Sequence, residues 1–168
     1  MIRKAKLNDL NSIMEIIKST VEEMKTYNNN QWDENYPQAK DFTNDIESGD
    51  LYVDDDRGNI KGFICVNFIE PVEYENINWS SNDKSMVIHR MAVNPKFRQQ
   101  GVASEMMHFA EKLASDNNVV YLKTDTYSIN TKMNSLFKKF GFNLVGEMSF
   151  LGKEKPFYCY DKLLKDFK

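Results

Sequence analysis

Apolar and polar residues alternate along the chain in a way that predicts strands and helices in mixed order. Between residues 10 and 24, apolar side chains recur three or four positions apart, which is the spacing of one face of an amphipathic helix. We expect Asn8 to cap this helix. A shorter helix carrying Phe42 and Ile46 is expected to end at Gly49, because glycine readily takes the backbone conformation that closes a helix.

Seven runs of the sequence predict strands, and the two at residues 51–54 and 60–68 are rich in β-branched and aromatic residues. The seven runs cover residues 1–6, 51–54, 60–68, 85–93, 119–125, 144–150 and 157–163. The run at 85–93 is almost continuously apolar, as is typical of a strand in the middle of a sheet. The polar segment at 70–84 predicts a long loop, and such loops often carry function.

Two more helices complete the pattern, one opened by Gly101 and one closed by Gly141. Strands with helices between some of them predict a mixed sheet covered on both sides, an α/β or α+β fold. No linker or repeat divides the sequence. We therefore expect a single domain over residues 1–168.

The composition, with 41% hydrophobic residues and a net charge of −3, is that of a soluble globular protein. No apolar run approaches the roughly 20 residues of a membrane span, and no signal peptide precedes the first helix, so we expect a cytoplasmic protein without a membrane partner. Dispersed charge gives no reason to expect nucleic acid as a partner. Cys65 and Cys159 lie in apolar runs and are expected to be buried. With His89 and His108 as the histidines, no ligand spacing predicts a metal site.

An acidic stretch at residues 41–56 holds seven acidic residues before Arg57. It is expected either to form a solvated face or, together with acidic residues of the 70–84 loop, to attract a cationic substrate. The first of these roles is the commoner one for a run of charge. Both remain open at the level of sequence.

A candidate anion site lies between the buried strand and the third helix, where residues 97–104 read FRQQGVAS. The first N–H groups of a helix have no partner within it, and the helix dipole places partial positive charge there. Gly101 lets the backbone approach an anion closely, and Arg98 adds a full charge. Neither a P-loop nor a dinucleotide fingerprint fits these residues.

Two segments resemble the GNAT superfamily of acyl-CoA-dependent N-acetyltransferases. Residues 88–95, IHRMAVNP, followed by RQQGVA at 98–103 are similar to its signature, and residues 130–142 resemble its second CoA segment. The resemblance extends over residues 1–164, and the opening part looks like uncharacterised bacterial members. It implies a GNAT-like, mostly antiparallel sheet of about seven strands with helices on both faces.

The resemblance also implies acetyl-CoA as cosubstrate, with no metal. The cofactor-binding residues that it implies are Met91, Ala92, Val93, Arg98, Gln99, Gln100, Gly101, Val102, Ala103, Ser104 and Asn130. Backbone groups of Met91 and Val93 would hydrogen-bond the pantetheine arm like an added strand. The amides of residues 99–104 would hold the pyrophosphate, and Asn130 would contact the cofactor, cap the last helix, or do both.

Two residues depart from the family pattern. Met133 stands where a small alanine is frequent, and Phe137 stands where many members have a tyrosine that protonates the leaving thiolate. Phenylalanine cannot donate a proton. Tyr127, Tyr158 or Tyr160 is therefore the candidate acid, unless solvent serves or catalysis has been lost; the candidates lie within the last strands and the loop before the last helix.

For the acceptor side, His89 is the candidate general base, since arylalkylamine N-acetyltransferases, which this stretch resembles, have a catalytic histidine at this strand position. Burial would keep its imidazole neutral and able to accept a proton, but a core histidine satisfied by a backbone carbonyl is an equal alternative. Trp32, Tyr36 and Tyr74 are candidate substrate-binding residues, or else they anchor loops.

The function expected from all this is acetylation of a primary amine, with a small cationic amine as acceptor. Protein N-termini or lysines are alternative acceptors, and a CoA-binding regulatory module without turnover is the alternative from another class. A monomer or homodimer is expected.

Overall fold

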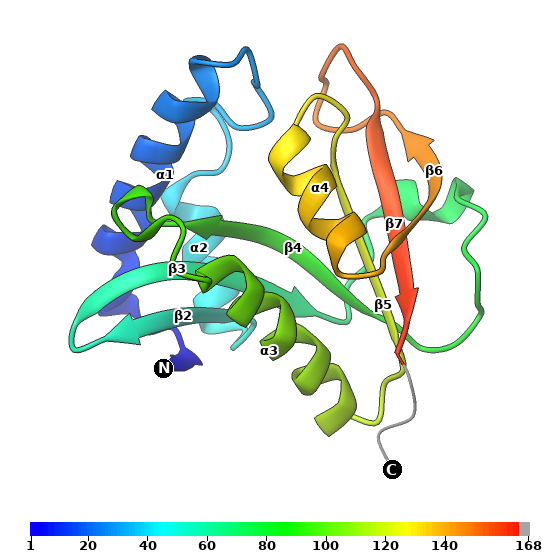
Figure 1. Cartoon of the computed structure of the whole chain (residues 1–168), viewed down its shortest axis with the longest axis horizontal. Helices are drawn as coiled ribbons and strands as arrows, with labels where there is room; N and C mark the ends of the chain where they lie inside the picture. The colour runs from blue at the N-terminus through cyan, green and yellow to red at the C-terminus, as the bar shows by residue number, and fades with distance from the viewer. Residues whose placement is uncertain (165–168) are drawn as a thin grey trace. The chain divides into compact units, whose positions relative to one another are not determined.

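The computed structural model describes residues 1–164 and contains the four helices and seven strands expected (Figure 1). The strands are β1 (Ile2–Lys4), β2 (Leu51–Asp56), β3 (Asn59–Asn67), β4 (Met86–Val93), β5 (Tyr121–Tyr127), β6 (Asn143–Met148) and β7 (Phe157–Leu163). The helices are α1 (Leu10–Lys25), α2 (Ala39–Glu47), α3 (Val102–Asp116) and α4 (Thr131–Lys139), and short 3-10 turns form η1 (Leu7–Asp9), η2 (Val72–Asn76) and η3 (Pro95–Phe97).

The strands form one sheet in the order β1-β2-β3-β4-β5-β7-β6. Strands β4 and β5 pair in parallel, with Met86 opposite Leu122 and Ile88 opposite Thr124. The β1–β2, β2–β3, β5–β7 and β6–β7 pairs are antiparallel. The expectation of a mixed, mostly antiparallel sheet of seven strands is confirmed.

The chain divides into two compact units. The first unit comprises Met1–Val66 and His89–Phe109, and the second comprises Asn67–Ile88 and the chain from Ala110 onward. Both units therefore contain segments that are distant in sequence. The expectation of one domain over residues 1–168 stays a prediction.

In the first unit, β3 has helices on both of its faces. The rings of Phe42 in α2 and Phe63 in β3 pack edge to face with centroids 5.1 Å apart. A side chain at position 62 would face the opposite side of the sheet. Its Cβ would come within 2.8 Å of the Ala92 carbonyl oxygen and 3.2 Å of the Met106 side chain in α3. Figure 1 shows α3 in front of this strand and α2 behind it. The missing side chain at position 62 therefore allows this close packing.

In the second unit, α4 covers one face of β7, where the rings of Phe137 and Tyr160 lie 5.5 Å apart. The excursion between β3 and β4, predicted as a loop, contains the turn η2 and packs on the other face of the β5–β7 pair, where Tyr74 joins Val87, Phe157 and Cys159 in a buried cluster. Both cysteines are buried, as expected.

Several strand boundaries differ from expectation by one or two residues, and two differences at the ends of elements have a clear cause. Asn8 does not cap α1, because it lies inside η1; the carboxylate of Asp9 instead accepts the Lys6 N–H at 2.7 Å. Strand β5 begins at Tyr121 rather than residue 119, because the Val119 N–H bonds the Ala114 carbonyl and so closes the turn that follows α3.

Candidate functional site

The turn before α3 has the geometry expected of an anion site. Gln99 and Gly101 both have left-handed backbone, with φ of 61° and 77°. The first hydrogen bond that closes the helix runs from the Glu105 N–H to the Gly101 carbonyl, which leaves the N–H groups of Val102, Ala103 and Ser104 without an intrahelical acceptor. A Cβ on Gly101 would meet nothing within 4 Å. The turn therefore presents open space beside donors that have no acceptor within the helix, which suits a phosphate group.

Arg98 is anchored at the start of this turn. Its guanidinium donates to the Glu23 carboxylate of α1 at 3.0 Å. The Arg98 Nε is buried and donates none of the hydrogen bonds found within residues 1–164. The charge predicted to face a phosphate is thus paired with α1 in this structure, and Gln99 and Gln100 are exposed.

Strand β4 supplies the other predicted cofactor contacts. Met91 and Ala92 are buried and Val93 is half-buried. His89 lies in the same strand and is half-buried rather than fully enclosed. It has interaction partners in this structure, so neither its proposed role as base nor the alternative of a satisfied core histidine is decided.

Arg90, next to His89, forms a cluster that the sequence did not reveal. Its guanidinium contacts both Asp45 oxygens of α2, at 2.7 and 2.8 Å, and donates to the Tyr36 hydroxyl at 2.8 Å. Burial raises the pKa of the Asp45 carboxyl, and Arg90 opposes that rise. Tyr36 is therefore held by a buried ion pair, while Trp32 is buried in the core of the same unit.

A second network lies in the second unit at the start of α4. Asn130 caps the helix, its Oδ1 accepting the Met133 N–H at 3.2 Å. Asn134, which sequence reasoning missed, donates to the carbonyls of Tyr127 and Asn130 at 3.1 and 2.8 Å and accepts the Tyr160 hydroxyl at 2.5 Å. The sequence feature that could have identified Asn134 is its position, since it is a polar residue four positions after Asn130 on the buried face of the helix.

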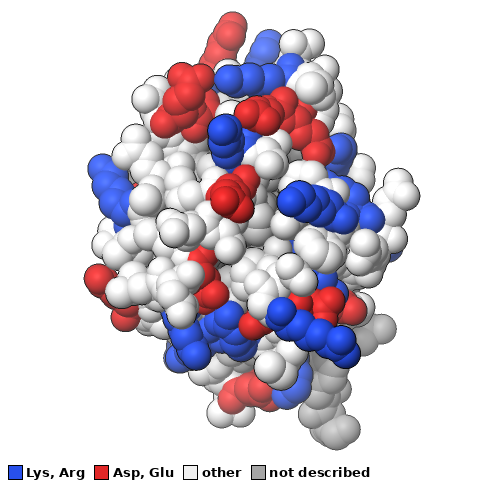
Figure 2. Space-filling model, turned by 90° about the vertical axis from the view of Figure 1, so that its left-hand side faces the viewer, with Lys and Arg blue, Asp and Glu red and all other residues white. Residues whose placement is uncertain are grey.

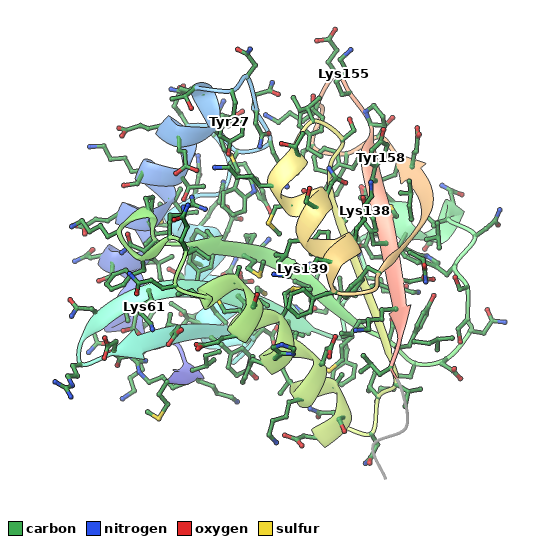
Figure 3. All side chains as sticks on the ribbon, in the orientation of Figure 1. Tyr27, Lys61, Lys138, Lys139, Lys155 and Tyr158 are labelled. Carbon is green, nitrogen blue, oxygen red and sulfur yellow. The ribbon has the colours of Figure 1, made fainter. Side chains whose placement is uncertain are left out.

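The three candidate tyrosines differ in what their hydroxyl groups do. Tyr160 is buried, and its hydroxyl donates a hydrogen bond to the Asn134 Oδ1. Tyr127 is buried and accepts the Lys155 N–H at 3.1 Å. Tyr158 of β7, labelled in Figure 3, is half-buried, and its hydroxyl makes none of the hydrogen bonds found within the described chain. Phe137 is buried against Tyr160 and Phe142.

Tyr74, predicted to line a substrate pocket, is 1% exposed, and its hydroxyl donates to Asp125 at 2.6 Å. Burial raises the pKa of Asp125 to about 6. Sequence reasoning placed Asp125 at the end of a strand and gave it no role. It lies inside β5, two residues before the strand ends.

The acidic stretch at residues 41–56 is less open than a solvated face would be. Asp45 pairs with Arg90, Asp54 with the N-terminal ammonium at 3.1 Å, and Asp55 with Arg3 at 3.0 Å. Glu70 of the excursion pairs with Lys123 at 2.5 Å. On the face shown in Figure 2, acidic and basic side chains are interspersed. Several of the carboxylates expected to attract a cation are therefore already neutralised by the protein.

Within residues 1–164, no group of three or more His, Cys, Asp or Glu side chains is placed to hold a metal ion. Over the same residues, no helix combines the length and apolar character needed to cross a membrane.

Comparison with known proteins gives matches to acetyltransferases. A crystal structure of a candidate acetyltransferase from Staphylococcus aureus Mu50 is 31% identical, with a TM-score of 0.79 over 98% of this chain and 99% of that one. A GNAT acetyltransferase from Streptococcus agalactiae 2603 has a TM-score of 0.86 at 23% identity, over 99% of this chain and 96% of that one, and so supports the fold.

Among sequence relatives, the streptothricin acetyltransferase of Escherichia coli is 29% identical over 120 residues, which are 71% of this chain and 64% of that protein. The chain thus spans less than two thirds of that relative. The model of the acetyltransferase (GNAT) family matches residues 14–142, which takes in both the turn before α3 and the start of α4. The chain therefore belongs to the acetyltransferase (GNAT) family and is an acyltransferase.

Proposed function

We propose that this protein transfers the acetyl group of acetyl-CoA directly to a primary amine, and that its acceptor is a small cationic amine. The family uses acetyl-CoA as its cosubstrate. A relative named streptothricin acetyltransferase supports a small molecule, rather than a protein N-terminus or lysine, as the acceptor.

The observation that carries the proposal is the turn before α3. Two left-handed residues, open space at Gly101 and the N–H groups at the helix start that have no acceptor within the helix fit a pyrophosphate, which can accept several backbone hydrogen bonds at once. We assign Met91 and Val93 to the pantetheine arm and Asn130 to a further contact with the cofactor. Bound acetyl-CoA would supply an activated thioester carbonyl, and the chain's own residues would manage the protons.

An amine is protonated in neutral water and must lose a proton before it can attack a carbonyl carbon. His89, half-buried in β4, is our candidate to accept that proton. Tyr158 is our candidate to donate a proton to the leaving thiolate. The Tyr160 hydroxyl already donates a hydrogen bond to Asn134, and Tyr127 is buried.

The first experiment measures acetyl-CoA binding by thermal unfolding. At one hundred times Kd, a ligand adds about 2.7 kcal/mol, which is on the order of 5 °C in Tm for a protein of this size. Gly101→Asp should abolish the shift, because its carboxylate would occupy the phosphate position. Gly58→Asp is the matched control, since Gly58 also has positive φ (90°) and no atom within 4 Å of an added Cβ, but lies in the β2–β3 turn. Loss of the shift in both variants, or in neither, would contradict the assignment.

The second experiment measures thiol release from acetyl-CoA with benzylamine, 1,4-diaminobutane, L-lysine, streptothricin and a lysine-containing peptide. His89→Gln should lower kcat/KM about 10²-fold at neutral pH, with partial recovery at high pH, where more amine is already neutral. Tyr158→Phe should lower kcat by a similar factor, and Tyr160→Phe should lower it less. A preference for the peptide would shift the proposal to protein acceptors, and no turnover with any amine would refute it.

A further inference from the structure

Asp125 is a half-buried carboxylate that pairs with no cation of the described chain. It lies in β5 on the face that packs against Tyr74, beside an otherwise apolar cluster containing Val87, Phe157 and Cys159. The Tyr74 hydroxyl donates to its Oδ2 at 2.6 Å. Its Oδ1 accepts none of the hydrogen bonds found within residues 1–164, and Oδ1 is also absent from the buried polar atoms that lack a partner. That oxygen therefore keeps contact with solvent.

The fully buried carboxylates of the described chain each have a cation or a second hydrogen bond, although Oδ2 of Asp54 is buried without a hydrogen-bond partner among residues 1–164. Asp9 pairs with Arg3 at 2.9 Å, Asp45 with Arg90 at 2.7 Å, and Asp54 with the N-terminal ammonium at 3.1 Å. Asp161 has no cation either, but it accepts two hydrogen bonds, from the Tyr121 hydroxyl at 2.5 Å and the Ser80 N–H at 2.9 Å. Asp125 is less enclosed than these four carboxylates, yet within the described residues it has one donor and no cation.

A carboxylate beside an apolar cluster is partly removed from water and costs stability, since a desolvated charge is tolerated only when it is paired and well hydrogen-bonded. Perturbed acidic groups of this kind gather at functional sites. The missing partner is a cation that can donate hydrogen bonds to Oδ1, and the proposed acceptor is a molecule of that chemistry.

We propose that Asp125 is the binding site for the ammonium group of the acceptor, with Tyr74 holding the carboxylate in place. This inference rests on the proposed function and gives a reason for its preference for cationic amines. It assigns a specificity role to two residues of the second unit.

The charge state of Asp125 suits this role. Burial raises the pKa of the carboxyl to about 6, the hydrogen bond from Tyr74 opposes that rise, and Glu73 of η2 adds to it. Cys159 of β7 lies opposite in the sheet register, and Lys123, two residues earlier on the same face of β5, has its ammonium bound to Glu70. At neutral pH Asp125 is therefore ionised and available to a bound cation.

The test reads the carboxyl group directly, so it does not depend on turnover. The full-length protein is labelled with ¹³C at the aspartate carboxyl carbons, and the resonance that disappears in Asp125→Asn is followed against pH by NMR. Saturating 1,4-diaminobutane should lower the apparent pKa of Asp125 by about one unit or more, because a bound ammonium favours the ionised form. Tyr74→Phe should raise it, since the hydrogen bond that stabilises the carboxylate is removed.

Tyr121→Phe is the matched control, because it breaks the equivalent tyrosine–aspartate bond at Asp161, and it should leave the Asp125 titration in place. In turnover assays, Asp125→Asn should raise KM for the cationic amine about tenfold or more and leave KM for acetyl-CoA within twofold.

An Asp125 titration that none of the panel amines moves would overturn the inference, even if the parent protein acetylates amines and the proposed function stands. A titration that moves with the amine in a protein without turnover would support the ammonium site and refute the proposed function. If Asp125→Asn proves unfolded by circular dichroism, Tyr74→Phe supplies the assignment and the same two outcomes decide.

Discussion

Asp45 of the first unit, which is buried, and Asp125 of the second, which is half-buried, are both carboxylates bound in a cluster that contains a tyrosine, yet the two clusters differ in one component. Asp45 has the Arg90 guanidinium on both oxygens, and that guanidinium also binds Tyr36. Asp125 has the Tyr74 hydroxyl and no cation within the described chain. The pKa of both carboxyls is raised by burial, but at Asp45 a permanent positive charge compensates.

The difference separates a structural ion pair from a carboxylate that a ligand can complete. An ion pair that is closed within the protein fixes the position of Tyr36 but has little left to offer a substrate. A carboxylate without a cation lowers stability until something positive binds. Stability measurements can therefore test the comparison independently of any acceptor.

The largest effect is expected from Arg90→Leu, which leaves Asp45 as an uncompensated buried charge. Breaking a buried pair in this way costs about 3–5 kcal/mol, and urea unfolding at pH 7 measures it. The double variant Arg90→Leu with Asp45→Asn should recover much of this loss, because no buried charge remains. Equal instability of the single and double variants would mean that the arginine matters for packing rather than for charge.

The second-largest change in the free energy of unfolding is expected from Asp125→Asn, and this variant should be more stable than the parent rather than less stable. A carboxyl whose folded pKa is raised from 3.8 to about 6 takes up a proton on folding, so its contribution to stability falls as pH rises through that window. At 1.36 kcal/mol per pKa unit, the asparagine variant should be more stable than the parent by at most about 3 kcal/mol at pH 8. The two should converge near pH 4. Chemical denaturation at both pH values measures the gap, and a gap independent of pH would contradict the assignment of this pKa to Asp125.

The smallest expected change in stability distinguishes the Tyr121–Asp161 hydrogen bond from the Tyr74–Asp125 hydrogen bond. Tyr121→Phe should cost about 1–2 kcal/mol, because Asp161 retains the Ser80 N–H. Tyr74→Phe removes the hydrogen bond that Asp125 receives, and its cost should be larger at pH 8, where the carboxyl is ionised, than at pH 5. Thermal unfolding of both variants at these pH values makes the comparison. Identical pH dependence in the two would show that Asp125 and Asp161 are equivalent.

Sequence reasoning reached those parts of the molecule that local patterns determine. The helices at α1 and α4 and the strand β4 follow from apolar spacing, and the turn before α3 follows from a glycine between a buried strand and a helix. These features depend on residues close together in the chain. The boundary errors at Asn8 and residue 119 came from local turn geometry, which spacing alone does not contain.

The side-chain clusters could not be predicted from the sequence, for a different reason. Tyr36 and Arg90 are 54 residues apart, and Tyr74 and Asp125 are 51 apart. Whether such residues meet depends on the strand register and on the path of the excursion between β3 and β4. The sequence identified Tyr36 and Tyr74 as aromatic residues of interest, but it contained no signal for their partners.

Gly62 has a consequence for the evolution of this protein. A Cβ there would come within 2.8 Å of the Ala92 carbonyl, so any replacement must displace the segment of β4 that carries Met91 and Val93. A genetic screen for loss of acetylation would therefore recover changes at position 62 alongside changes in catalytic groups. The position would look functional in such a screen although glycine offers no side chain for chemistry, and lineages of this protein would have little freedom to drift there.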